Sequence, residues 1–256
     1  MNTIVTSMSK AYYELCGERW ISSFSEHLPN SRLIIYSEDA KYLSRYIKHS
    51  VILKDLHNVA GYDAFVEVAK EREALLPEDK KTNYRWQASR FCHKPFAIYD
   101  VMEVYGEVYW FDADVELTST PTINTLRAIY APSYSISMLQ RTNWPHCEGG
   151  FIGFNACHML VDTWMKFYTT ESIFKLQEWH DCMALDVSVA LSNTYVNNVS
   201  QGLTSKHVWP ETVLNTFSRH NKGPGRKAEV YGDCKEATNR VVLSDDATLH
   251  NSWLSK

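Results

Sequence analysis

The stretch "EVYWFDADVEL", from Glu107 to Leu117, joins an apolar, aromatic-rich run to two aspartates separated by one alanine. In an extended strand, residues two apart project from the same face, so Asp112 and Asp114 point the same way if the strand continues through them. Two ionised carboxylates at close range repel each other unless a positive charge lies between them. Mg²⁺ or Mn²⁺ meets that need, because these hard cations bind carboxylate oxygens and leave positions open for phosphate oxygens.

An Asp-x-Asp pattern alone is a weak signal, because aspartate also favours the turns that follow strands. Its position favours the metal interpretation over the turn. In open α/β sheets, ligands bind beyond the carboxyl ends of the strands, and Asp112 directly follows the strand predicted at 106–111.

The N-terminal part of the chain alternates between strand and helix patterns. Short apolar runs at 2–7, 32–39 and 50–56 predict strands, and helical patterns at 9–28 and 41–49 lie between them. This β-α-β-α-β order predicts an α/β protein with a Rossmann-like, doubly wound, mostly parallel sheet and helices on both faces.

Two longer helices are predicted further along. The first covers 86–105, with Pro95 bending it or marking its true start. The second covers 158–168. Its predicted buried side consists of Met159, Leu160, Thr163, Trp164, Phe167 and Tyr168.

Composition narrows the protein class. The chain has 256 residues, 45% of them hydrophobic and 22% charged, with a net charge of -4, as in ordinary soluble globular proteins rather than general polyanion binders. The opening "MNTIVTSMSK" does not resemble a signal peptide, and no stretch approaches the roughly 18 apolar residues of a membrane span. Six cysteines without a Cys-x-x-Cys pair predict reduced thiols rather than a disulfide scaffold or a zinc site. A cytoplasmic protein is therefore predicted.

Four blocks of sequence add a more specific signal. They are "RFCHKPFAIYDVMEVYGEVYWFDADVEL" (90–117), "CEGGFIGFN" (147–155), "LQEWHDCMALD" (176–186) and "LHNSW" (249–253). In this order they resemble the motifs of GT-A fold glycosyltransferases, including bacterial and phage relatives of glycosyltransferase family 8. The chain departs from the family pattern at Gly149 and Cys92, where serine is common, and it lacks a Lys-Pro-Trp ending. These departures leave the donor sugar open.

The resemblance implies a single GT-A domain over 1–256. Residues 1–117 would form the nucleotide-sugar-binding half, and 118–256 an acceptor-side half with a C-terminal metal histidine. The implied activity is metal-dependent transfer of a hexosyl or pentosyl group from a nucleotide-diphosphate sugar, most often UDP-linked, to an acceptor hydroxyl. The implied setting is the cytosol of a bacterium or of a phage-infected host.

The resemblance also implies a set of metal ligands. Asp114, together with Asp112 either directly or through ribose and water, would hold Mn²⁺ or Mg²⁺. His250 of "LHNSW" matches the family's metal histidine, and an imidazole ligand favours Mn²⁺. The alternative for His250 is a surface histidine near the terminus.

Four further residues are candidates for contacts to the nucleotide-sugar. Arg90 and Lys94 lie four apart on the predicted helix and would share a face that pairs with the diphosphate, although spacing alone favours a solvated basic face. Thr6 and Ser7 end the first strand, where a nucleotide base or ribose binds in this fold class.

Two carboxylates are candidates for the chemistry. Asp181 is the first candidate for the base that an inverting enzyme needs, and in a retaining enzyme it would instead position the donor. Glu148 is the second candidate, or it hydrogen-bonds the donor sugar. Helix capping and turn polarity are the alternatives for both. Gly149 and Gly150 would let the backbone approach that sugar closely.

The acceptor stays open among a surface glycan, a lipid-linked sugar, a protein and a modified DNA base. The negative net charge disfavours DNA, but the basic segments 80–94 and 219–227 keep it in consideration. The second of these segments is interpreted first as a solvated loop, and otherwise as a lid over the diphosphate or a contact to an anionic acceptor. Its basic residues are Arg219, Lys222, Arg226 and Lys227.

Two alternative functions remain at this stage. Nucleotidyl transfer also uses a doubly wound sheet and carboxylate-bound metal, but it would release pyrophosphate. A catalytically silent nucleotide-sugar-binding protein is the other, against which the intact candidate carboxylates argue.

Overall fold

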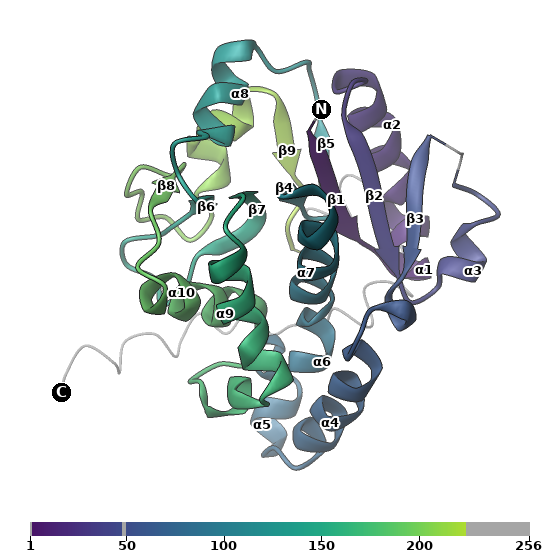
Figure 1. Ribbon diagram of the computed structural model, residues 1–256, viewed down its shortest axis with the longest axis vertical. Coiled ribbons are helices and arrows are strands. Elements are labelled where there is room, and N and C mark those ends of the chain that lie inside the picture. The colour runs from purple at the N-terminus through teal and green to yellow at the C-terminus, as the bar shows by residue number, and fades with distance from the viewer. Residues whose placement is uncertain (1, 48–49, 224–256) are drawn as a thin grey trace.

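The computed structural model describes residues 2–47 and 50–223, which form an α/β fold around a seven-stranded sheet (Figure 1). The strand order is β3-β2-β1-β4-β7-β6-β8. These strands are β1 (Thr3–Ser7), β2 (Arg32–Ser37), β3 (Val51–Asp55), β4 (Glu107–Phe111), β6 (Ile136–Leu139), β7 (Glu148–Asn155) and β8 (Val196–Asn198). A separate two-stranded sheet pairs β5 (Val115–Leu117) with β9 (Ser218–His220).

Most neighbouring strands run parallel, so the predicted doubly wound, mostly parallel sheet is confirmed. Strands β1, β2, β3 and β4 are mutually parallel, as are β6 and β8, whereas β7 runs antiparallel to both β4 and β6. The short link from β6 to β7 explains the reversal, because a parallel connection needs a crossover of a dozen or more residues.

The helices of the described part match most of the predicted ones. They are α1 (Lys10–Tyr12), α2 (Glu18–His27), α3 (Ala40–Leu43), α4 (Tyr62–Ala74), α5 (Glu78–Lys81), α6 (Ala88–Phe91), α7 (His93–Tyr105), α8 (Ile123–Tyr130), α9 (His158–Thr169) and α10 (Asp181–Leu191). A π-helical turn at Tyr13–Gly17 joins α1 to α2. The helix predicted at 86–105 divides into α6 and α7 at Cys92. Pro95 then lies in the first turn of α7, where its missing N–H needs no partner.

Helices cover both faces of the sheet, as predicted. In β4, Val108 and Trp110 point into one hydrophobic core, while Tyr109 and Phe111 point into the other. The first core is filled by apolar side chains of α4, α7, α9 and α10, and the second by those of α2, β5 and the segment before β9. Successive side chains of β4 thus pack alternately into the two hydrophobic cores. The end of the strand is left for polar residues.

The buried side of α9 differs from the predicted one. It consists of Leu160, Val161, Trp164, Met165 and Tyr168, whereas Met159 is 69% exposed. The predicted and observed sides share Leu160, Trp164 and Tyr168, but Val161 and Met165 complete the buried side in place of Met159. The prediction for Met159 was therefore wrong.

Two general properties concern thiols and membranes. Among the described residues, no helix combines the length and the apolar character needed to cross a membrane. Five cysteines are free thiols: Cys16, Cys92, Cys147, Cys157 and Cys182. Cys234 lies outside the described residues.

Replacing Trp164 by alanine tests the packing of α9. The side chain is fully buried between the helix and the sheet, so Trp164→Ala should lower the free energy of unfolding by about 3–5 kcal/mol. Met159→Ala on the same helix is the control and should stay within about 0.5 kcal/mol of wild type. Urea denaturation measures both, and equal losses would contradict the assigned helix face.

Candidate metal and donor site

The two aspartates lie in a turn rather than along a strand. Strand β4 ends at Phe111, and the N–H of Val115 donates to the carbonyl of Asp112 at 3.0 Å, closing the turn into β5. The strand ends at Phe111, as predicted, so the condition under which both aspartates would project from one strand face is not met. Their carboxylates nevertheless converge, because both approach the same histidine ring.

That histidine is His220, which strand β9 brings to the site. In the β5–β9 pair, His220 lies opposite Val115, the residue that follows Asp114. Its Nε2 is 3.2 Å from Asp114 Oδ1 and 3.8 Å from Asp112 Oδ2. The ligand atoms of these three side chains all lie within 4.8 Å of one another. The two-stranded sheet thus assembles a carboxylate–carboxylate–imidazole group at the carboxyl end of β4.

Glu148 fixes the orientation of the His220 ring. Its Oε1 lies 3.2 Å from His220 Nδ1, and its Oε2 accepts the Val208 N–H at 3.1 Å. Burial alone would raise the pKa of Glu148, but Lys222 and His220 lower it to about 2. With Nδ1–H donated to this carboxylate, Nε2 faces the two aspartates, which is the arrangement that supports a metal-ligating histidine.

The two carboxylates beside His220 favour a positive charge between them. Burial would lower the pKa of His220, but Asp114 and Glu148 outweigh it and raise the pKa to about 9. A protonated ring therefore supplies positive charge between the carboxylates when no ion does. Two carboxylate oxygens and one imidazole nitrogen suit Mn²⁺ better than Mg²⁺, so the residues present fit the divalent ion that the sequence predicts.

Lys94 lies behind this group and is itself buried. Its ammonium is 2.8 Å from Asp181 Oδ2 and 3.1 Å from Asp112 Oδ1, and it donates to the Gly149 carbonyl at 2.8 Å. Burial opposes its charge, but Asp112 and Asp181 raise its pKa above the usual value. Lys94 is thus a fixed cation that joins α7, α10 and the ends of β4 and β7. The alternative that it belongs to a solvated basic face is wrong.

The two glycines of β7 leave room for these side chains. A Cβ at Gly149 would lie 2.7 Å from Cys182 Sγ and 2.8 Å from Lys94 Nζ. At Gly150 it would lie 2.5 Å from His220 Cε1. Both positions therefore admit only glycine as long as the protein's own side chains stay where they are.

The other predicted residues are less closely joined to the group. Thr6 and Ser7 end β1, next to β4 in the sheet, and the buried Thr6 hydroxyl has no hydrogen-bond partner among the described residues. Arg90 lies on α6, not on the helix of Lys94, so the argument that the two share one helix face is wrong. His250 lies outside the described residues.

Sequence reasoning missed His220. It considered segment 219–227 for its lysines and arginines and passed over its histidine. The sequence feature that could have pointed to His220 is a histidine in a polar segment C-terminal to the Asp-x-Asp pair. Nothing local in the sequence predicts that "SRH" pairs with "VEL" and so reaches Asp114.

Comparisons with known proteins give structural similarity only. No protein-family model and no curated protein matches the chain. Similar solved structures include apo mouse xyloside xylosyltransferase 1, with a TM-score of 0.45 and 13% identity over 75% of this chain and 82% of that one. They also include the glycosyltransferase GlyE of Streptococcus pneumoniae TIGR4, with a TM-score of 0.44 and 12% identity over 73% of this chain and 43% of GlyE. These similarities concern the backbone fold and define no activity for this chain.

Removing the charge of Lys94 should leave the buried Asp181 carboxylate and the half-buried Asp112 carboxylate without their ammonium partner. We expect Lys94→Met to lower the free energy of unfolding by about 3–5 kcal/mol, because an unpaired buried charge is left behind. The matched control is Lys54→Met, which breaks a more exposed pair with Asp100 and should cost about 0–1 kcal/mol. Both are measured by urea denaturation, and a Lys94 loss no larger than that of Lys54 would contradict the role assigned to Lys94.

Proposed function

We propose that this protein is a glycosyltransferase that moves a sugar from a nucleoside-diphosphate sugar to an acceptor hydroxyl. The observation that carries the proposal is the convergence of Asp112, Asp114 and His220 within 4.8 Å at the carboxyl end of a sheet strand. Ligands of open α/β sheets bind at this edge. The four motif blocks support the same activity, and a UDP-sugar is the first donor to test.

The proposed division of labour follows from the contacts. Asp112, Asp114 and His220 would hold Mn²⁺, which when bound neutralises the charge that develops on the departing diphosphate. Glu148 acts through His220 by holding its ring. We propose this positioning role for Glu148 instead of direct chemistry, because it is 1% exposed and both of its oxygens are already engaged.

We assign Asp181 to the donor sugar. It lies at the start of α10, and its Oδ2 is paired with Lys94 at 2.8 Å beside Gly149. Because Asp181 is 2% exposed and already paired, we propose that it positions the donor through Lys94 and does not act as a base. The remaining contacts follow the sequence predictions, with Thr6 and Ser7 at the nucleotide, Arg90 at the diphosphate, and Gly149 and Gly150 near the sugar.

The proposal extends to the division of the chain. Residues 1–117 would hold the nucleotide-sugar and residues 118–256 the acceptor, with His220 reaching from the second part to the ion. The acceptor is a glycan, a lipid-linked sugar, a protein or a modified DNA base. A DNA acceptor predicts retention on DNA that falls with salt concentration.

Variants of the proposed ligands test the function. Asp114→Asn and His220→Ala should each reduce Mn²⁺-dependent release of nucleoside diphosphate by at least about 100-fold. The measurement is mass spectrometry of nucleotide products from a panel of nucleotide-sugars, with Mn²⁺ or with EDTA. The control is His158→Ala, which alters an exposed histidine and should retain wild-type turnover.

Two outcomes would contradict the proposal. Full turnover in both ligand variants would remove these residues from the site. Release of pyrophosphate would indicate nucleotidyl transfer instead. His250→Ala, assayed in the same series, decides between the two histidines: we expect turnover to depend on His220.

A further inference from the structure

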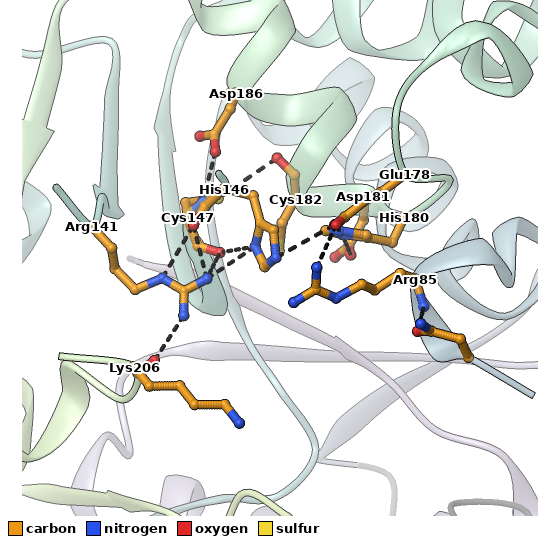
Figure 2. A network of polar contacts seen from close by, with 11 residues as sticks. Arg85, Arg141, His146, Cys147, Glu178, His180, Asp181, Cys182, Asp186 and Lys206 are labelled. Atoms are coloured by element: carbon orange, nitrogen blue, oxygen red, sulfur yellow. Dashed lines mark hydrogen bonds and ion pairs between the residues drawn. The ribbon is translucent and has the colours of Figure 1, made fainter. Parts of the chain in front are cut away.

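A second group of metal-ligating side chains lies on the other side of Asp181. It consists of His146, in the loop before β7, with His180 and Cys182 at the start of α10 (Figure 2). The ligand atoms of these three residues lie within 4.8 Å of one another. The group shares no residue with Asp112, Asp114 and His220, and it contains nitrogen and sulfur where that site is rich in oxygen.

The His180 ring is held from outside the group. Its Nε2 lies 2.8 Å from Glu178 Oε2, and Glu178 Oε1 accepts from Arg85 Nη1 at 2.5 Å. The ring is 2% exposed. With Nε2–H donated to a carboxylate, Nδ1 is the nitrogen left for a ligand, as in the carboxylate–histidine pairs that support metal sites.

The His146 ring has a nitrogen without a hydrogen-bond partner. Its Nδ1 lies 2.9 Å from the Cys147 carbonyl and 3.0 Å from Arg141 Nη2. Its Nε2 is buried, has no hydrogen-bond partner among the described residues and lies 3.7 Å from Glu178 Oε2. The side chain is 9% exposed. If Nδ1 accepted from Arg141, Nε2–H would be a buried donor with no acceptor within hydrogen-bond distance, which is costly. Donation from Nδ1 to the Cys147 carbonyl avoids this and leaves the Nε2 lone pair facing the group. Arg141 Nη2 then donates to the His146 and Cys147 carbonyls.

Arg141 holds the backbone around His146 in place. Its Nη2 donates to the His146 carbonyl at 2.8 Å and its Nη1 to the Lys206 carbonyl at 2.7 Å. The loop is thus braced independently of the imidazole. Both histidines therefore have an outer contact that orients the ring, which is what a preformed ligand set requires.

Cys182 supplies a soft ligand. Its side chain is 9% exposed, and its Sγ lies within 4.8 Å of a ring nitrogen of each histidine. A thiolate with two imidazoles is a donor set typical of Zn²⁺ and foreign to Mn²⁺ or Mg²⁺. Glu178 and Asp181, both close to His180, offset positive charge at this position.

We propose that His146, His180 and Cys182 bind a zinc ion with three protein ligands and an open fourth position. A cavity of about 350 Å³ lies against His146, and its lining also includes Trp144 and Cys147. The ion ties the loop before β7 to the start of α10. It thereby fixes Asp181 and Gly149, which both contact the Lys94 ammonium. With three protein ligands the site differs from the closed four-ligand structural sites of zinc, and the role proposed for it is to hold the donor-binding edge in place.

Metal content and Co²⁺ spectroscopy test the zinc site without an activity assay. Purified full-length protein should bind Zn²⁺, and the bound ion should raise its Tm by several degrees. Co²⁺ in its place should give the intense near-ultraviolet charge-transfer absorption of a cobalt–thiolate bond. Cys182→Ser should abolish this absorption, and His146→Asn should weaken Zn²⁺ binding by at least about 100-fold. Cys16→Ser, which alters a buried thiol elsewhere, should change neither.

The two metal sites should be separable. Asp114→Asn should retain Zn²⁺ and the cobalt–thiolate absorption, and His146→Asn should retain Mn²⁺ binding. The proposal fails if wild-type protein binds no Zn²⁺ and shows no cobalt–thiolate absorption. It also fails if the absorption persists in Cys182→Ser, or if Cys16→Ser removes it. Wild-type protein, compared without and with zinc, already gives the Tm difference. The test therefore does not depend on the folding of any one variant.

Discussion

The buried ammonium of Lys94 is the contact on which the organisation of the site depends. It touches a carboxylate at the tip of β4, a carboxylate at the start of α10 and a carbonyl of β7. These three elements are far apart in the sequence, and without Lys94 the two carboxylates and the carbonyl oxygen would face one another with no ammonium between them. A buried ion pair of this kind contributes little net stability, yet it strongly disfavours arrangements in which a partner is left unpaired. Its main effect is to specify where Asp112 and Asp181 lie.

The pairing of carboxylates with a positive charge also explains the neighbouring group of Asp112, Asp114 and His220. Asp112 and Asp114 approach His220, whose raised pKa keeps a positive charge between them. Glu148 holds the ring from the other side and is too deeply buried to meet solvent. The carboxylates are thus already gathered before an ion arrives, so little reorganisation is needed to bind one. On the opposite side of Asp181, His146, His180 and Cys182 present nitrogen and sulfur, which suit a different metal.

Much of the fold could be predicted from the sequence because its signals are local. Alternating apolar runs defined β1 to β4, and Pro95 marked the start of α7 within two residues. The antiparallel direction of β7 could not be predicted from such local patterns, because the direction of a strand depends on the loop that precedes it and on the strands with which it pairs. Met159 was misplaced because Val161 and Met165 complete the buried side of α9 in its place, and only the packing partners decide this.

The site was predictable in part for the same reason. Asp112, Asp114, Glu148 and Asp181 stood out through motif context, and the structure gathers them around Lys94 and His220. His220 itself arrives through the β5–β9 pairing, a contact between residues about a hundred positions apart that leaves no local trace. The neighbouring histidine and thiolate group was equally hidden. Its members come from two segments, and their spacing does not resemble a zinc motif.

The most direct test of the central claim is a calorimetric titration of Mn²⁺ into the protein with and without UDP. If Asp112, Asp114 and His220 hold an ion that in turn binds the diphosphate, UDP should tighten Mn²⁺ binding by at least about fivefold, and Mn²⁺ should tighten UDP binding by the same factor. Binding of Mn²⁺ and UDP with no effect on each other, or no Mn²⁺ binding at all, would contradict the account.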